Sequence, residues 1–318
     1  YRLLGDKAVA GDEPCAMPKA CKNEVEVTGM VEAHLRDAAA MVELLCWLDA
    51  QAPGSLTETR VVTQLETCRR MDNALQDISF ETIAGTGPNG AIMHYRVTEE
   101  TDSVLEDGHL LVLDSGGQYL DGTTDITRTI AIGVPGDQEC RSFTRVLQGM
   151  IGMSRLRWPV GMAGRDIECI GRVPLWLAGQ DFNHGLGHGV GAFLSVHEGP
   201  QRLSRVSHVP LQPGMILSNE PGYYRDGAFG IRIENLLVVR EAAALPELLV
   251  ERLTLLGRVL HGRAVRVGGE GKAPDVRVHP LADFVEICPR IGHLLGSEGP
   301  VLRREGELGR ALEHRDVG

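Results

Sequence analysis

The chain lacks the long apolar stretches that mark membrane proteins. No run of about 18 apolar residues occurs in its 318 residues, so we expect no membrane-spanning helix. The first residues also lack the charged-then-apolar layout of a signal peptide. Because the chain starts with Tyr1 and not with methionine, we expect that an upstream portion is missing, and a targeting segment could have gone with it.

Positive charge is not in excess. The 32 Lys and Arg residues face 43 Asp and Glu residues, which gives a formal net charge of -11 at pH 7. Proteins that bind nucleic acid draw most of their affinity from neutralising phosphates, and this chain has no such surplus. We therefore expect no nucleic-acid partner, and small molecules or peptides fit better as ligands.

Paired cysteine motifs are also missing. The seven cysteines are an odd number, they are widely spaced, and no two of them are separated by only two residues. This pattern argues against both a disulfide framework and a zinc ribbon. It indicates reduced thiols and predicts a cytoplasmic protein.

What is present is a globular composition, 43% hydrophobic and without low-complexity tracts, long enough for one large domain or two smaller ones. Apolar periodicity predicts helices first and then an antiparallel sheet interrupted by helices, which is an α+β fold. The expected elements are helices over 23–49, from 55 or 57 to 71, 138–157 and 165–177, a strand, glycine loop and second strand over 78–99, and strands over 215–220 and 230–239.

Residues 110–129 are predicted to form a hairpin that carries two aspartates. If it closes near Tyr119 and Leu120, Asp114 and Asp125 lie opposite each other on one face. Two like charges in such positions destabilise the pair unless a cation lies between them. A hard divalent cation would meet this need, because it prefers carboxylate oxygens. The alternative is that both aspartates cap turns and face water.

A second dense patch begins at His184 and His188. Two histidines four apart could mimic a zinc-protease helix, but no glutamate follows the first, and four glycines make a helix improbable. Glycines instead let the backbone approach a ligand closely and leave the imidazoles free to point into a cavity. The alternative is a glycine-rich turn with incidental surface histidines.

Two further carboxylates, Glu220 and Glu234, lie in otherwise apolar strands. A charge in such a strand is costly unless it is paired, binds a metal or faces solvent at a sheet edge. Together with Asp114, Asp125 and His188 they suggest a two-metal site. Such oxygen-rich ligation favours Mn, Fe, Co or Zn, and two cations about 3.5 Å apart would polarise a carbonyl and activate water for hydrolysis.

Five segments carry a resemblance that covers residues 19–239. They are MHY at 93–95, DSGGQYLDGTTDITRT at 114–129, HGLGHGVG and HEGP within 184–200, SNEPGYY at 218–224 and GIRIEN at 230–235. In order and spacing they resemble the proline-specific metallopeptidases of the creatinase/aminopeptidase family, most closely its aminopeptidase P (Xaa-Pro aminopeptidase) branch. The resemblance implies the pita-bread fold, a curved antiparallel sheet flanked by helices.

The resemblance also implies a ligand set for two divalent metal ions. Asp125 and Glu234 match the family's bridging carboxylates, Asp114 matches a ligand of one ion, and His188 and Glu220 match ligands of the other. Manganese (Mn2+) is the expected metal, with zinc and cobalt as alternatives.

Three histidines and an arginine match the family's other site residues. His94, His184 and His197 are expected to bind substrate and handle protons, and Arg232 is expected to assist in binding. Glu220 is the expected proton acceptor.

The function implied is hydrolysis of the bond between an N-terminal residue and a following proline. The expected partner is a peptide with proline at its second position, and a homodimer is a further expectation. Prolidase, which cleaves only dipeptides, is the nearest alternative, and a pita-bread binding protein without catalysis is another. Methionine aminopeptidase fits the motifs less well, and creatinase is disfavoured by the intact ligand set.

Three regions are expected along the chain. Residues 1–18 are interpreted as a linker or the remnant of a missing N-terminal domain, and residues 19–245 as the catalytic domain. Residues 246–318 form a divergent C-terminal region in which the resemblance ends and apolar periodicity fades. We expect this region to lie outside the catalytic core.

Overall fold

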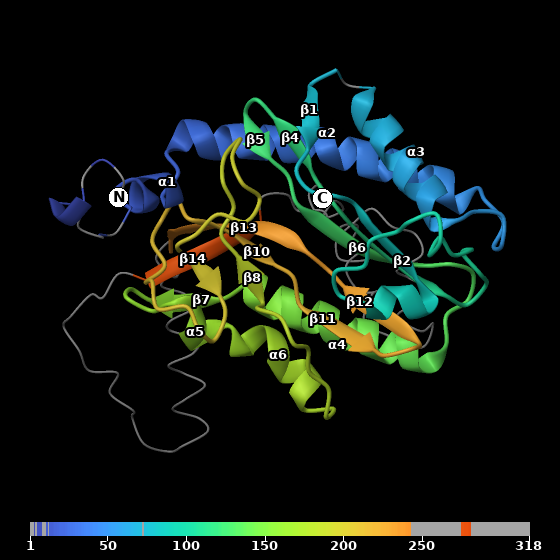
Figure 1. The fold of residues 1–318 in the computed structure, drawn as a ribbon. Helices are drawn as coiled ribbons and strands as arrows, with labels where there is room; N and C mark the ends of the chain where they lie inside the picture. Colours follow the sequence, from blue (N-terminus) through green and yellow to red (C-terminus); the bar gives the residue numbers. More distant parts are fainter. Residues whose placement is uncertain are drawn as a thin grey trace, which may run out of the picture. The chain divides into compact units, whose positions relative to one another are not determined.

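The computed structural model describes residues 3, 5–7, 11, 13–71, 73–242 and the backbone of 275–280 (Figure 1). In this part of the chain no helix combines the length and the apolarity needed to cross a membrane. The six described cysteines are all free thiols.

Two helices at the start of the catalytic region match the predicted pair. The helix α2 (Glu24–Asp49) begins with a capping box, in which the Asn23 side chain accepts hydrogen bonds from the backbone of Val25 and Glu26 and the Glu26 side chain accepts one from the Asn23 backbone. The helix α3 (Glu58–Arg70) follows. Both predicted helices are therefore confirmed.

All strand pairs among the described residues are antiparallel. One sheet joins β2 (Ile83–Thr86), β3 (Leu110–Ser115) and β6 (Ile126–Ala131), and another has the order β10, β13, β14, β7. The bounds in this second sheet are Ile216–Asn219, Asn235–Glu241, Asp275–Pro280 and Arg157–Pro159.

Shorter elements complete the described part of the chain. They are η1 (Gly5–Lys7), α1 (Ala16–Ala20), β1 (Leu75–Ile78), η2 (Gly87–Ala91), β4 (Gly117–Tyr119), β5 (Gly122–Thr123), α4 (Asp137–Ser154), α5 (Gly164–Ile167), α6 (Cys169–Trp176), β8 (Gly187–His188), β9 (Arg202–Leu203), β11 (Gly222–Arg225) and β12 (Phe229–Arg232).

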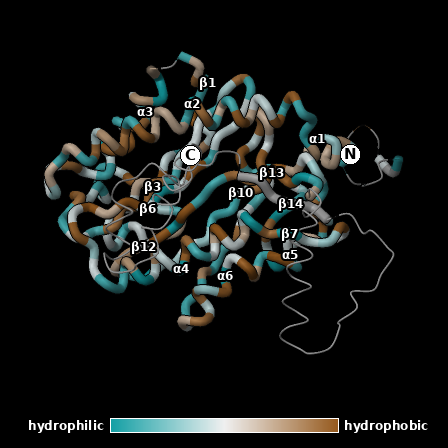
Figure 2. Tube along the Cα trace, turned by 180° about the vertical axis from the view of Figure 1, so that it is seen from behind, coloured by the Kyte–Doolittle hydropathy of each residue, from teal (hydrophilic) through white to brown (hydrophobic). Residues whose placement is uncertain are grey.

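Helices cover the sheets from two sides (Figure 1). On one side α2 and α3 pack on β3, with Leu44 and Leu65 against Leu111 and Leu113. On the other side α4 packs against β10 and β12, and α6 packs against α4. Polar and apolar residues alternate along these helices (Figure 2), as expected for elements with one face on a sheet. The predicted α+β fold is thus confirmed.

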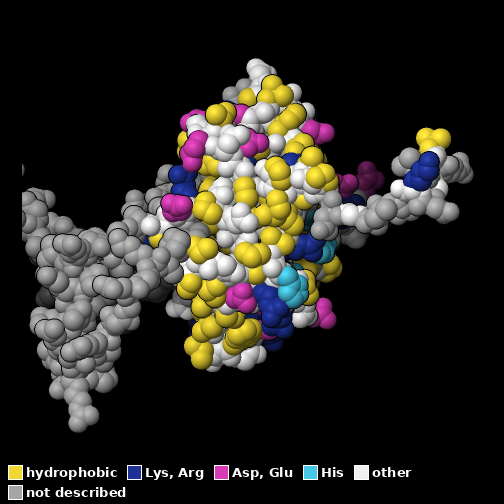
Figure 3. Space-filling model, turned by 90° about the vertical axis from the view of Figure 1, so that its left-hand side faces the viewer, with side chains coloured by type: hydrophobic (Ala, Val, Ile, Leu, Met, Phe, Trp, Pro, Cys, Tyr) yellow, Lys and Arg dark blue, Asp and Glu magenta, His cyan; other side chains and the backbone are white. Residues whose placement is uncertain are grey.

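One face of the molecule carries many hydrophobic side chains among scattered charges (Figure 3). The exposed large apolar residues include Trp176, Leu177 and Val206, whose relative exposures are 42%, 85% and 72%. Such side chains are common singly on protein surfaces, and they gain meaning only when they gather.

Two strand predictions are wrong in detail. No strand follows the glycine loop, because the segment after η2 is held by side chains in place of a ladder, with the Tyr95 hydroxyl donating to Glu58 at 2.7 Å. The single strand predicted over 230–239 is two strands. It breaks at Ile233 and Glu234, where the chain leaves its partner β11 and joins β10.

The aspartate hairpin forms with a register that differs from the predicted one. It turns at Leu120 and Asp121, one position later than predicted, so Asp114 pairs with Thr127 and not with Asp125. Because Asp125 lies two residues before Thr127, it points to the same face as Asp114 along a diagonal. The two charges still meet on one side of the sheet.

The expected outer regions are partly structured. Within the expected linker over residues 1–18, residues 16–18 belong to α1. Within the expected divergent region, Asp275–Pro280 form β14, which is hydrogen-bonded between β13 and β7. These six residues contribute to the sheet, against the expectation of a separate tail. The rest of residues 246–318 lies outside the described residues, so the domain boundary at 245 stays a prediction.

A buried ion pair ties the helices to the aspartate hairpin. The Arg69 guanidinium donates to both carboxylate oxygens of Asp37, at 2.8 and 2.9 Å, and to the Ser115 hydroxyl at 3.0 Å. The Tyr119 hydroxyl donates to the same aspartate at 2.8 Å. Arg69 and Asp37 are 0% and 2% exposed, so neither charge has water as an alternative partner. This pair therefore joins α2, α3, β3 and β4.

We predict that Arg69→Ala destabilises the domain by about 3–5 kcal/mol, because it leaves a buried carboxylate without its cation. The neighbouring Arg70 is a matched control, since its side chain is 66% exposed and pairs only with Glu66. Arg70→Ala should cost less than about 0.5 kcal/mol. Urea unfolding of the two variants measures the difference, and equal costs would contradict a structural role for the Arg69 pair.

Candidate metal centre

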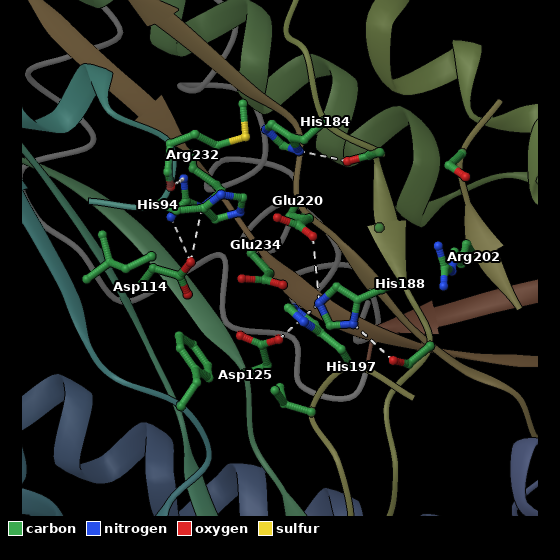
Figure 4. Close-up of a pocket in the computed structure, with 18 of the residues that line it drawn as sticks. His94, Asp114, Asp125, His184, His188, His197, Arg202, Glu220, Arg232 and Glu234 are labelled. Atoms are coloured by element: carbon green, nitrogen blue, oxygen red, sulfur yellow. Dashed lines mark hydrogen bonds and ion pairs between the residues drawn. The ribbon is translucent and has the colours of Figure 1, made fainter. Parts of the chain in front are cut away.

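The five predicted metal ligands line one cavity of about 630 Å³ (Figure 4). They come from separate elements. Asp114 is in β3, Asp125 precedes β6, His188 is in β8, Glu220 follows β10 and Glu234 lies between β12 and β13. Residues more than 100 positions apart in sequence are thus brought together by the sheets.

The ligand atoms lie close enough for a shared ion. One donor atom each from Asp125, His188 and Glu234 lie within 4.8 Å of one another. The His188 Nε2 atom is 3.4 Å from Asp125 Oδ2 and 3.7 Å from Glu220 Oε1. Short metal–ligand bonds of about 2.0–2.2 Å place the ligands of one ion at such separations.

The orientation of His188 suits a metal ligand. Its Nδ1 atom lies 2.9 Å from the backbone oxygen of Gly189, which can only accept, so Nδ1 carries the proton and donates. In the neutral ring Nε2 then presents a lone pair to the carboxylates of Asp125 and Glu220. A lone pair facing negative oxygens is repulsive unless a cation lies between them.

The carboxylates repel one another in the absence of a cation. Burial, and after it the charges of Asp114 and Glu220, raise the pKa of Asp125 well above its usual range. Burial and the charge of Asp125 do the same to the pKa of Glu234. Burial and the neighbouring Glu234 raise the pKa of Glu220 to about 8. Without a metal ion, these three carboxyl groups therefore hold protons more strongly than usual, and a bound metal ion would replace those protons.

One carboxylate oxygen of Asp114 accepts hydrogen bonds, and the other has no hydrogen-bond partner. Its Oδ2 atom accepts from Arg232 Nη2 at 2.7 Å and from Nε at 3.2 Å. Its Oδ1 atom is buried and has no hydrogen-bond partner. A buried acceptor of this kind is costly unless something binds it. Four carboxylates, among them Asp114 with this unpaired oxygen, and one imidazole therefore fit the ligand set of two divalent cations.

The glycines around His188 also allow close packing of the backbone. A Cβ atom on Gly187 would lie 1.9 Å from the backbone oxygen of Ser218, and one on Gly189 would lie 2.1 Å from that of Glu198. These glycines let β8 pass against neighbouring backbone. Both also line the cavity, and the predicted approach of the backbone to a ligand stays a prediction. The close passage brings His188 beside Glu220.

The three predicted substrate histidines, His94, His184 and His197, line the same cavity. The rings of His197 and His188 meet edge to face at 4.1 Å between centroids. Burial, followed by the His188 charge, lowers the pKa of His197. The His197 ring therefore loses its proton more readily than the ring of an exposed histidine.

His184 is the last acceptor in a series of hydrogen bonds that starts at Arg232. Arg232 Nη1 donates to the Tyr224 hydroxyl at 2.7 Å, and this oxygen lies 3.0 Å from His184 Nε2. His184 Nδ1 lies 2.7 Å from the backbone oxygen of Gly185, so it is the donor there. The Tyr224 hydroxyl consequently donates to Nε2. Burial lowers the pKa of His184 to about 3, which agrees with a neutral ring.

Sequence reasoning gave no role to Tyr224 and Thr127, although both lie within the quoted motifs. The Thr127 hydroxyl donates to Glu234 Oε2 at 2.7 Å and so orients a predicted bridging carboxylate. A signal for Thr127 existed, because a residue two positions from Asp125 in a strand shares its face. Nothing in the sequence indicated that Tyr224 would connect Arg232 to His184.

Comparison with known proteins agrees with this geometry. The model of metallopeptidase family M24 matches residues 28–241. The fold is the pita-bread fold expected from the sequence, with the carboxylate-rich cavity among its antiparallel strands. The chain belongs to metallopeptidase family M24.

Individual relatives point to one branch of the family. The chain is 50% identical over 233 residues to aminopeptidase P2 of Arabidopsis thaliana, covering 72% of this chain and 33% of the relative. It is 48% identical over 234 residues to Xaa-Pro aminopeptidase 1 of Dictyostelium discoideum, covering 71% and 37%. The chain thus spans about a third of the length of these curated relatives.

A solved structure is similar as well. It is the X-prolyl aminopeptidase of Caenorhabditis elegans, described as a cytosolic enzyme with a di-nuclear active site. The TM-score is 0.75 at 31% sequence identity, and the match covers 88% of this chain and 42% of that chain.

We predict that the metal-free protein becomes less stable as the pH rises. The pKa of Glu220 is raised in the folded state to about 8 from an ordinary 4.5, so folding binds protons and its stability is lost between these values. Added Mn2+ replaces the protons, and its stabilising effect should grow over the same window. Thermal unfolding at about pH 5.5 and about pH 8.5, with EDTA or with Mn2+, measures both effects.

The matched variant for this experiment is Glu220→Gln, which cannot titrate. It should flatten the pH dependence of the metal-free protein. A metal-free wild type that is more stable at the higher pH, relative to this variant, would contradict the prediction.

A second prediction separates the ligands. Asp125→Asn and Glu234→Gln should each lose more metal than Asp114→Asn, because a bridging carboxylate serves both ions. Elemental analysis after dialysis measures the metal content per chain. Asp121→Asn is the control, since this residue lies at the tip of the same hairpin and pairs with Arg36 outside the cavity. Equal losses at Asp114 and Asp125 would show that the bridging roles are wrongly assigned.

Proposed function

We propose that this chain is the catalytic part of a two-metal aminopeptidase that hydrolyses the bond between an N-terminal residue and a following proline. The observation that carries the proposal is the convergence of four carboxylates and one imidazole on one cavity, with His94, His184 and His197 lining it. The aminopeptidase P relatives support proline as the second residue.

The proposed metal is manganese, because hard oxygen ligands with one imidazole suit it, with zinc or cobalt as alternatives. When bound, two such ions supply a Lewis acid for the scissile carbonyl and lower the pKa of a water molecule. Asp114, Asp125, His188, Glu220 and Glu234 would hold them.

The proton steps fall to side chains of the cavity. Glu220 is the proposed proton acceptor from the attacking water, since it lies at the cluster and is held among buried groups that favour protonation. The leaving nitrogen of proline carries no hydrogen of its own, so it must receive a proton as the bond breaks. We assign that delivery to Glu220, with His94 and His197 beside the reacting peptide.

His184 has a more restricted role in this geometry. Its two nitrogens are engaged by Gly185 and Tyr224, so the ring is fixed and neutral. A substrate group that bonds to Nε2 must replace the Tyr224 hydroxyl. We propose that His184 and Arg232 act together through Tyr224, binding substrate on the side of the cavity next to Asp114.

We also propose a location and an assembly state. A cytosolic location follows from the free thiols and from the description of the Caenorhabditis elegans enzyme. A homodimer is proposed because exposed apolar side chains are available for an interface (Figure 3).

The experiment that tests the activity uses the full chain, stripped of metal and reloaded with Mn2+. It should cleave Xaa-Pro-Xaa tripeptides after the first residue, and Xaa-Pro dipeptides more slowly, as followed by mass spectrometry of the products. Cleavage of dipeptides alone would favour prolidase. No cleavage by protein that retains its metal would favour the binding protein without catalysis.

His184→Ala is the informative variant in the same assay. It should lower turnover by about 100-fold, the scale expected when substrate is misplaced, while metal content stays near that of the wild type. Asp125→Asn should lose both. Loss of metal in His184→Ala would mean that this histidine is a ligand and that its assignment is wrong.

A further inference from the structure

One arginine of the cavity has no part in the proposed reaction. Arg202 lies in β9, directly opposite His188 of β8 in the antiparallel pair. Opposed residues of such a pair have side chains on one face, with Cβ atoms about 5 Å apart. Arg202 lines the cavity, and Figure 4 shows it on the side of His188 that faces away from Asp114.

The other cavity arginines are already paired. Arg232 bonds to Asp114 at 2.7 Å, and Arg96 bonds to Glu81 at 2.7 Å. Among the described residues, no carboxylate lies within ion-pair distance of Arg202.

Each carboxylate that lines the cavity either pairs with a cation or is a proposed metal ligand. Two of the six, Glu81 and Glu198, pair with cations, the latter with Lys19 at 3.4 Å and Lys22 at 3.9 Å. The other four are the proposed metal ligands, and two divalent cations would offset their charge. Among the described residues that line the cavity, Arg202 is then the cation that has no ion-pair partner.

We propose that Arg202 binds a carboxylate of the peptide on the carboxyl side of the proline, so that short peptides with a free carboxyl end are preferred substrates. This rests on the proposed function. The direction follows from charge, because the ammonium group of the first residue lies next to the scissile bond and is repelled by the guanidinium. The peptide therefore runs with its carboxyl end toward Arg202.

The size of the substrate follows from the same geometry. The terminal carboxylate of a tripeptide lies two residues beyond the scissile bond, which is about 7 Å of extended chain. Arg202 starts from the strand position beside His188, so its long side chain covers a distance of this order. A guanidinium also matches a carboxylate with two parallel hydrogen bonds.

The test compares peptides that differ only in charge at the third residue. They are Xaa-Pro-Gly, its C-terminal amide, and the amide of Xaa-Pro-Asp, each assayed with wild type, Arg202→Gln and Arg96→Gln. Wild type should favour the free acid over its amide by about fivefold in kcat/KM, mainly through KM, and less so at about 1 M salt. Arg202→Gln should remove this preference, and Arg96→Gln, whose arginine is already paired, should retain it.

The aspartyl amide distinguishes the two sources of a carboxylate. Equal preference for it would mean that Arg202 reads an acidic third side chain as well as the chain end. A preference that survives Arg202→Gln, or a wild type without preference, would overturn the proposal. Calorimetric binding of the product Pro-Gly and of its amide gives the same comparison without turnover, so a failure of the proposed peptidase activity is distinguishable from a failure of this inference.

Discussion

Mutual repulsion among four carboxylates, three of them buried and Glu220 partly buried, is the constraint on which the rest of the structure depends. Asp114, Asp125, Glu220 and Glu234 share one cavity, and burial together with neighbouring charge raises the pKa of the last three. Such a cluster is costly as ions without a counter-charge. The cavity is therefore a place where binding of cations and folding of the domain reinforce each other.

The fold holds this cluster together by anchoring it from several directions. Arg232 neutralises one oxygen of Asp114 and contacts His184 through Tyr224, so one buried cation joins a proposed metal ligand to a proposed substrate-binding histidine. The Asp37–Arg69 pair fixes the hairpin against α2 and α3. Local stability and the geometry of the site are thus set by the same few charged side chains.

The substrate end of the cavity obeys a simpler electrostatic rule. Once two divalent cations offset the ligand carboxylates, the charges of the paired residues around the cavity cancel. Arg202 then carries the remaining positive charge. Under the proposed function, discrimination among peptides in this cavity would then come from the charge of the peptide end. Arg202 owes its place to the pairing of β8 with β9, which sets it opposite His188.

The sequence by itself determined the helices α2, α3 and α4, the antiparallel fold class and the nine candidate site residues, because apolar periodicity and ordered motifs are local properties. The single helix predicted over 165–177 is instead the two helices α5 and α6. The sequence misplaced the features that depend on contacts between segments far apart in sequence. The register that sets Asp114 diagonal to Asp125, the missing strand after η2 and the break at Glu234 follow from contacts with distant segments. Only the tertiary structure joined Tyr224 to His184 and left Arg202 without a carboxylate partner among the described residues, because pairing of side chains far apart in sequence is decided by packing of the sheets.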